Sequence, residues 1–132
     1  MSKFLVLKKR RDFLRAAKNI TMVSKNVMIQ AAPSLYSDID DNKKARVGFT
    51  ATKRLGKAHI RNKTKRRLRA IMREVYDEYT LNMIDYVLVG RYNTFSCSFE
   101  DLKKDIIWAL KKTNKILLRD KADNEENSNI NG

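Results

Sequence analysis

The chain has one cysteine, one proline and four glycines among its 132 residues, and it has no long apolar run. The lone cysteine, Cys97, excludes an internal disulfide and is typical of a reducing compartment. No apolar stretch approaches the length of a membrane span. The N-terminal segment has only four apolar residues in a row and no small-residue cleavage site, so we expect no signal peptide. Together these absences predict a cytoplasmic protein with no membrane contact.

Residues that usually carry protein-based catalysis are also scarce. The single histidine, His59, lies among cations that would oppose its protonation, which favours a polar contact or a packed ring over a general base. Zinc ligands are too few for a structural site, and the isolated glycines form neither a Walker loop nor a dinucleotide-binding fingerprint. Asp38, Asp40 and Asp41 could gather a divalent ion, but such a cluster is usually only a turn. We therefore expect any reacting groups to come from another molecule.

Positive charge is what the sequence has in excess. Lys and Arg number 29 against 15 Asp and Glu, and the formal net charge is +14, which is typical of nucleic-acid binders and less often of membrane-surface proteins. The excess is concentrated between Thr52 and Arg73, where ten residues are Lys or Arg and none is acidic. On a helix, an arc of roughly 140° then holds six polar side chains of this segment: Arg61, Asn62, Lys65, Arg66, Arg69 and Arg73. A separate arc of about 120° holds the side chains expected to face a core: Ile60, Thr64, Leu68, Ile71, Met72, Val75 and Tyr79.

Three interpretations of this basic helix compete. A solvated face usually mixes charges of both signs, whereas here the first acid is Glu74, after the cations have ended. A helix for a membrane surface or a calmodulin-like partner carries bulky anchors, whereas this one offers Thr64, Leu68 and Met72, which suit packing against a sheet. So dense a field of like charge favours a polyanion partner, and nucleic acid best fits that description.

The remaining pattern predicts alternating helices and strands. We expect an extended arm at 1–8, a short helix at about 9–19, strands at 27–32 and 45–52, the basic helix at about 58–79 and a buried strand at 86–90. Residues 35–44 are expected to form a polar hairpin connection. Gly48 inside its strand suggests a bulge or a close approach of other backbone. Ser98 is a plausible N-cap for a last helix, whose apolar side is expected to begin at Phe99.

This order predicts an α+β fold, an α/β sandwich with one small central sheet. Residues 1–118 should form a single RNA-binding domain, and residues 119–132 (RDKADNEENSNING after Leu118) should form a disordered polar C-terminal tail. Helices on one face of the sheet would leave the other face, or a groove at its edge, open for a ligand.

One stretch of the sequence resembles the bacterial ribonuclease P protein subunit. The resemblance runs from Arg46-Val47-Gly48 through the Lys53-Arg54-Leu55-Gly56 turn to Arg61-Asn62 and the cations up to Arg69, with the spacings of the family held without gaps. It extends more weakly to Asp12-Phe13 upstream, and downstream to the strand beginning at Asp85 and the last helix.

The resemblance implies a ribonucleoprotein endonuclease that cleaves the 5′ leader from precursor tRNA. The RNA subunit would perform the hydrolysis with Mg²⁺ that it mainly binds itself, which agrees with the missing catalytic groups. The resemblance also implies a ribosomal-protein-S5-domain-2-like fold whose crossover through the basic helix is left-handed, an exception to the usual rule. The partners would be the catalytic RNA and precursor tRNA, and the protein would be a monomer or weak dimer without RNA.

The family pattern also implies two sets of site residues. The face for the RNA subunit would comprise Lys53, Arg54, Lys57, Arg61, Asn62, Lys65, Arg66, Arg69 and Arg73. The cleft for the precursor leader would comprise Phe13, Met28, Gln30, Thr50 and Thr52, with Lys53 nearby. Many members carry further aromatic residues where Ala17, Met28, Gln30 and Ala31 stand here, which weakens base stacking in the cleft.

Two other classes of function compete with this interpretation. A ribosomal or RNA-chaperone protein could use the same basic helix as structural support for RNA, and composition alone does not separate it from the ribonuclease P subunit. The gap-free strand, turn and helix motif favours the subunit. A DNA-binding module is the weakest alternative, because the sequence has no helix-turn-helix pattern.

Overall fold

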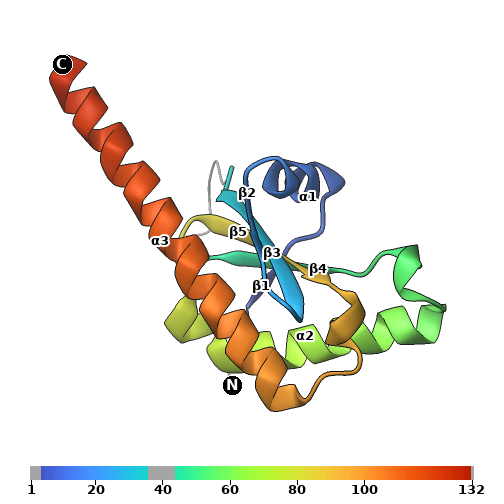
Figure 1. The fold of residues 1–132 in the computed structure, drawn as a ribbon. Coiled ribbons are helices and arrows are strands. Elements are labelled where there is room, and N and C mark those ends of the chain that lie inside the picture. The colour runs from blue at the N-terminus through green and yellow to red at the C-terminus, as the bar shows by residue number, and fades with distance from the viewer. Residues whose placement is uncertain (1–3, 36–43, 132) are drawn as a thin grey trace.

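The computed structural model describes residues 4–35 and 44–131, with side chains described as far as Asp123. A five-stranded sheet, in the order β1-β4-β5-β3-β2, is combined with three α-helices (Figure 1). The strands are β1 (Leu5–Val6), β2 (Ile20–Val23), β3 (Val27–Pro33), β4 (Arg46–Thr50) and β5 (Ile84–Gly90). The helices are α1 (Arg10–Ala17), α2 (Ala58–Tyr79) and α3 (Phe99–Asn131), with short 3₁₀ turns η1 (Lys53–Leu55) and η2 (Tyr92–Thr94). The predicted α+β fold class is confirmed.

The centre of the sheet is the parallel pair β4 and β5, which the crossover helix α2 joins. β1 adds a second parallel pair beside β4, and β3 runs antiparallel to β5 along its whole length. Because β5 lies between β3 and β4, the predicted hairpin connection at 35–44 is wrong: the two strands that it joins are not neighbours. Residues 36–43, including Asp38, Asp40 and Asp41, lie outside the described residues. The left-handed sense of the crossover stays an expectation.

A strand that the sequence analysis did not identify, β2, forms a hairpin with β3. The Ser24 backbone N–H donates to the Val27 carbonyl at 2.9 Å, and the Ser24 hydroxyl donates to the same oxygen, which closes the turn. Ile20 and Met22 are half-buried while Thr21 and Val23 are exposed. This alternation is a strand signal, although it spans only four residues.

The sheet buries both of its faces against helices. On one face, α2 and α3 cover alternate residues such as Ile29, Val47 and Tyr86, which form the larger core. On the other face, α1 brings Ala16 onto Ala32 and Val87 in a smaller core. All seven residues of β5 are buried, as the continuous apolar run predicts, although the strand begins at Ile84 rather than Tyr86. Among the described residues, only the short helix α1 packs on this second face.

α3 begins where the sequence predicts. The Asp101 N–H donates to the Ser98 hydroxyl at 3.1 Å, as expected of an N-cap. Phe99, placed on the apolar side by its spacing, is 42% exposed, because it lies in the first turn beyond the edge of the core.

The structure continues α3 to Asn131, where the sequence analysis expects a disordered tail from residue 119. Once a helix is formed, each further residue adds one hydrogen bond, and neither proline nor glycine interrupts residues 119–131. The side chains of residues 119–123 are all exposed and this end of α3 projects from the domain, so it adds nothing to the core (Figure 1). The domain boundary near residue 118 stays a prediction.

Candidate nucleic-acid interface

The basic helix α2 has the bounds that the sequence predicts, 58–79. Its buried side chains are Thr64, Leu68, Ile71, Met72, Val75 and Tyr76. A Cβ added to Gly90 of β5 would lie 2.5 Å from the Thr64 methyl carbon, so that glycine permits the close approach of α2 to the sheet. The seam that sequence periodicity identified therefore fixes the rotation of the helix about its axis.

The opposite side of α2 carries an open groove of about 500 Å³ lined by polar side chains. Its lining residues are His59, Asn62, Lys65, Arg66 and Arg69, which we call the α2 ridge. Four of the five belong to the predicted face. The fifth, His59, was assigned only a polar or packing role, although its spacing of three, seven and ten residues from Asn62, Arg66 and Arg69 places it on the same helix face.

Other predicted residues surround the ridge without lining the groove. Arg73 is exposed on α2, and Lys53, Arg54 and Lys57 are exposed at the turn that precedes the helix. Arg61 is half-buried, and its Nε atom is buried without a hydrogen-bond partner. All nine predicted residues are thus carried by α2 or by the turn before it.

Two cations in the same run have other contacts. Arg67 donates hydrogen bonds to the carbonyls of Thr94, Phe95 and Cys97, which ties α2 to the segment that follows β5. The Lys63 ammonium lies 4.7 Å from the centre of the Phe95 ring. Neither was included in the predicted face, because both fall outside its arc. Charge alone would not have separated them from the ridge.

The residues predicted for a leader cleft lie mostly on the sheet face that α1 partly covers. Strand register places Met28, Val89 and Thr50 in one row across β3, β5 and β4, and Gln30, Val87 and Gly48 in the next. Facing residues of neighbouring strands project to the same side of a sheet. Met28, Gln30 and Thr50 are half-buried and therefore still reach solvent. Thr52 is exposed beyond the end of β4.

Phe13 of α1 lies directly over this face. A Cβ added to Gly48 would lie 2.6 Å from the tip of the Phe13 ring, so the glycine makes room for it. The sequence analysis expects a bulge or a close approach of other backbone at Gly48, whereas the structure shows the approach of the Phe13 side chain. Phe13, like Met28, is half-buried and packs against the smaller core, so one part of its ring faces the core and another the surface.

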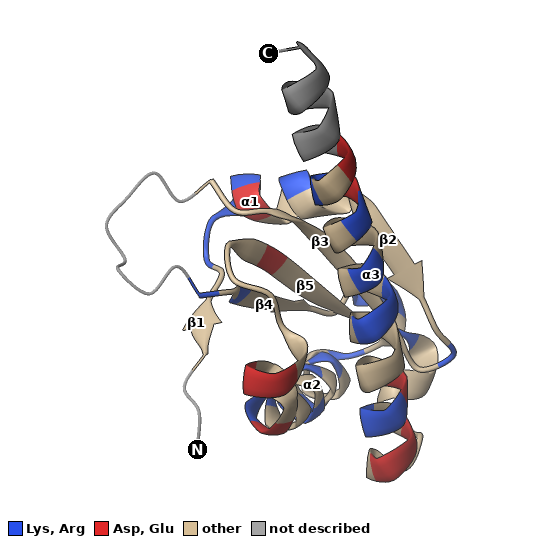
Figure 2. Ribbon diagram, turned by 90° about the vertical axis from the view of Figure 1, so that its left-hand side faces the viewer, with Lys and Arg blue, Asp and Glu red and all other residues tan. Residues whose placement is uncertain are grey.

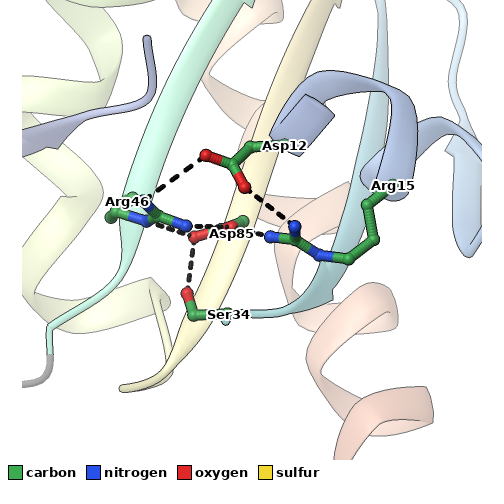
Figure 3. Close-up of polar contacts among 5 residues, drawn as sticks. All are labelled: Asp12, Arg15, Ser34, Arg46 and Asp85. Atoms are coloured by element: carbon green, nitrogen blue, oxygen red, sulfur yellow. Dashed lines mark hydrogen bonds and ion pairs between the residues drawn. The ribbon is translucent and has the colours of Figure 1, made fainter. Parts of the chain in front are cut away.

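A buried network of charges, not predicted from the sequence, holds α1 in place (Figure 3). Asp85 of β5 has no exposed surface, and its carboxylate accepts two hydrogen bonds from Arg46 of β4, at 2.8 and 2.7 Å, one from Arg15 of α1 and one from Ser34. Arg15 also donates to Asp12 at 2.8 Å, and Arg46 lies 3.5 Å from the second Asp12 oxygen. We call Asp12, Arg15, Arg46 and Asp85 the charge network. Two carboxylates and two guanidinium groups give it no net charge.

The charge network also controls the ionisation of Asp12. Burial alone would raise the pKa of Asp12, but the hydrogen bond from Arg15 and the charges of Arg46, Arg15 and Arg11 outweigh it, so the pKa lies below its usual value of 3.8. Asp12 therefore stays ionised, and the residue beside it, Phe13, is held over the sheet.

The described part of the chain does not bring together metal-binding side chains or a reactive thiolate. Among the described side chains of residues 4–35 and 44–123, no three His, Cys, Asp or Glu come together as metal ligands, and Asp12 and Asp85 are already bound by arginines. Burial raises the pKa of the Cys97 thiol, which disfavours the reactive thiolate. In the same residues, every helix is too short or too polar to cross a membrane.

Comparison of the sequence with known proteins identifies the family of this chain. The ribonuclease P family model matches residues 1–114. The ribonuclease P protein component of Gluconacetobacter diazotrophicus is 42% identical over 107 residues, which cover 80% of this chain and 88% of that protein. The corresponding protein of Ruegeria pomeroyi is 41% identical over 108 residues, with 81% and 84% covered.

Solved structures agree in fold. The RNase P protein from Thermotoga maritima superposes with a TM-score of 0.67 at 23% identity, covering 81% of this chain and 96% of that one. The Staphylococcus aureus RNase P protein gives 0.66 at 23% identity, with 84% and 96% covered. From the family match and the relatives in sequence, we conclude that the chain belongs to the ribonuclease P protein family, the protein component of the ribonucleoprotein endonuclease that processes the 5′ end of precursor tRNA.

Proposed function

We propose that the α2 ridge binds the catalytic RNA of ribonuclease P. The observation that carries this proposal is that Lys65, Arg66 and Arg69 line one open groove and, within the described residues, form no ion pair with a carboxylate. Cations that the protein leaves unneutralised on a rigid helix are available to RNA phosphates, with release of counterions on binding.

Each type of side chain on the ridge has a role in this proposal. The planar guanidinium of Arg66 can hold a phosphate through two parallel hydrogen bonds. The Asn62 amide can contact a base edge or a 2′-hydroxyl, which distinguishes RNA from DNA. The first N–H groups of α2 receive no hydrogen bond from the side chain of its N-cap residue, Lys57, so they too can face a phosphate. Lys53, Arg54, Arg61 and Arg73 would extend the same surface at its two ends.

The precursor leader, in our proposal, lies on the sheet face beneath α1. Phe13 offers a ring for stacking, and Thr50 and Gln30 offer hydrogen-bonding groups on the same face. Met28 would supply an apolar surface under the leader. Thr52 lies at the end of the proposed site that is nearest to η1 and α2. With one ring in place of several, stacking of roughly 1–3 kcal/mol per base would be limited to a single nucleotide.

The catalytic centre would belong to the RNA. No set of described side chains fits a Mg²⁺ ion, because the buried carboxylates Asp12 and Asp85 are neutralised by arginines. Ions needed by the holoenzyme would then be held mainly by the RNA, and the protein would bind and position the two RNAs. We place this assembly in the cytoplasm, which agrees with a single, unpaired cysteine, Cys97.

Reconstitution tests the proposal directly. The protein is added to a bacterial ribonuclease P RNA at low Mg²⁺, and cleavage of precursor tRNA is followed. We expect faster cleavage with the protein, and a loss of that acceleration in the double variant Lys65→Ala with Arg66→Ala. The matched control removes two lysines outside the ridge, Lys103→Ala with Lys121→Ala. If the protein does not accelerate cleavage, a purely structural RNA-binding role is the better interpretation.

The leader contact has a separate test. A photoreactive nucleotide placed in the 5′ leader should crosslink near Phe13 or Thr50, whereas one placed in the catalytic RNA should crosslink to α2. Leader crosslinks that fall on the α2 ridge would show that the sheet face is not the leader site.

A further inference from the structure

α3 carries a second basic surface that the functions above do not use. Its buried side, with Leu102, Ile106 and Leu110, packs in the larger core. The opposite side is exposed, and an arc of about 100° on it holds cations and one large ring. These residues are Lys104, Trp108, Lys111, Lys112, Lys115 and Arg119, which we call the α3 stripe. Figure 2 shows Lys and Arg positions distributed along α3.

Within the part of the chain whose side chains are described, the cations of the α3 stripe form no ion pair with a carboxylate. Between Lys104 and Arg119 the only acid in the sequence is Asp105, and its carboxylate accepts the Asn26 backbone N–H at 3.1 Å instead. Lys103, which does pair with a carboxylate, Glu74 at 3.3 Å, lies on a different side of the helix. A solvated helix face usually mixes charges of both signs, so this one-sided arrangement favours an anionic partner.

The ring in the middle of the α3 stripe narrows the choice of partner. Trp108 is the only tryptophan of the chain and is 45% exposed, although Ile107 beside it packs on the core. A flat aromatic ring flanked by lysines at one helical turn on either side, Lys104 and Lys111 or Lys112, is the combination that binds single-stranded nucleic acid: a base stacks on the ring while cations follow the backbone. The Lys111 ammonium lies 5.7 Å from the centre of the Tyr79 ring, so a second aromatic ring lies beside the α3 stripe.

We propose that the α3 stripe is a second RNA-binding surface, which takes a single-stranded segment by stacking on Trp108. This proposal goes beyond the function proposed above, because the α3 stripe includes neither the α2 ridge nor the sheet face. The acids Glu74 and Glu78 are exposed on the last turns of α2, and Glu74 pairs with Lys103 of α3. One RNA could be held at α2 while a flexible single strand is held at α3.

The tryptophan itself reports on the test. The protein with Lys65→Ala and Arg66→Ala, which removes two cations of the α2 ridge, is titrated at low salt with a short oligouridylate while Trp108 fluorescence is recorded. We expect saturable quenching that weakens as salt is added. An unchanged spectrum at saturating RNA overturns the proposal. So does a change that follows protein concentration without RNA, because the surface would then bind a second copy.

Variants in the same background separate stacking from charge. Binding of a labelled oligouridylate is measured by anisotropy for Trp108→Leu, which keeps apolar bulk but cannot stack well, and its affinity should fall roughly five- to 100-fold. Lys111→Gln with Lys115→Gln should reduce the salt slope by about 0.7 for each lost contact with a single strand.

The matched control for charge is Lys103→Gln with Lys121→Gln, two cations on the same helix outside the stripe. Equal losses in the control and in the stripe variants would mean that only net charge matters, and the proposal would fail. Because every variant carries the same weakened α2 ridge, differences among them report on α3 and do not depend on whether the ridge binds the catalytic RNA.

Discussion

The charge network and the α2 ridge use the same side chain, arginine, in opposite ways. In the network, Arg15 and Arg46 are directed at the buried carboxylates of Asp12 and Asp85. On the ridge, Arg66 and Arg69 face an open groove, and among the described residues they pair with no carboxylate. The arginines of the charge network are neutralised within the protein, whereas those of the α2 ridge are available to an anionic partner. An arginine therefore indicates structure or binding only once its partners are known.

Arg67 makes the comparison sharper, because it lies next to Arg66 in sequence and has a structural role. Its guanidinium bonds to three backbone carbonyls in the segment that leads into α3. Adjacent residues on a helix are about 100° apart, so Arg66 and Arg67 point in different directions. We therefore expect different outcomes from removing the charge network, Arg67 or the arginines of the α2 ridge.

The largest expected effect is a loss of stability when the charge of Asp85, at the centre of the charge network, is removed. Asp85→Asn keeps the size of the side chain but leaves Arg15 and Arg46 without their shared buried charge. Removing one partner from a buried ion pair costs about 3–5 kcal/mol. We expect the free energy of unfolding, measured by urea denaturation, to fall by that amount. The control is Arg73→Ala on the surface of α2, and a loss in Asp85→Asn no larger than in this control would show that the network contributes little to stability.

The next effect concerns Arg67→Ala. This change leaves the carbonyls of Thr94, Phe95 and Cys97 without their donor, and we expect a loss of about 2–3 kcal/mol in the free energy of unfolding. RNA affinity measured well below the melting temperature should keep its salt dependence, because Arg67 would contact no phosphate. Its matched comparison is Arg66→Ala, which removes the same charge one residue away. If both variants change RNA binding alike, position on the helix does not separate the two roles.

The contrast between the two regions also explains what the sequence could predict. The ridge follows from a helical period of 3.6 residues within one uninterrupted segment. The same period predicts the helix bounds and five of the six buried side chains, and it misses Tyr76. The charge network joins residues up to 70 positions apart, and Asp85 stands at the start of an apolar strand with no local sign of its partners. Periodicity is local information, whereas ion pairs between elements depend on topology.

The same distinction accounts for the wrong connection between β3 and β4. A polar segment between two strands is typical of a hairpin, but which strands become neighbours is decided by the whole sheet, and here β5 pairs with both. Likewise, β2 is too short for its alternation to stand out, and it is held by its pairing with β3. The leader-face residues were placed by resemblance to a family, and the strand register then gathered most of them on one side of the sheet.

A smaller effect is expected from the ridge variant Lys65→Ala with Arg66→Ala in binding to the catalytic RNA. Each lost phosphate contact should reduce the slope of log affinity against log salt by about 0.7–0.9, so the slope should fall by about 1.4–1.8. Stability should hardly change, because neither residue contacts the core. The measurement is a filter-binding series across salt concentrations, with Lys103→Ala and Lys121→Ala as the control. An unchanged slope would place the main interface elsewhere on the protein.

The smallest effect is a pH dependence that belongs to the charge network and has no counterpart on the ridge. Because the pKa of Asp12 in the folded protein lies below the usual 3.8 of the unfolded chain, the unfolded state binds more protons between these values, and stability rises with pH there. The contribution of Asp12 is thus complete above pH 3.8 and is lost as the pH falls through its folded-state pKa.

Asp12→Asn should cost about 1 kcal/mol at neutral pH. Urea unfolding at a series of pH values should show this difference shrinking in acid. A difference that stays constant would mean that Asp12 acts through its shape and hydrogen bonds and not through its charge.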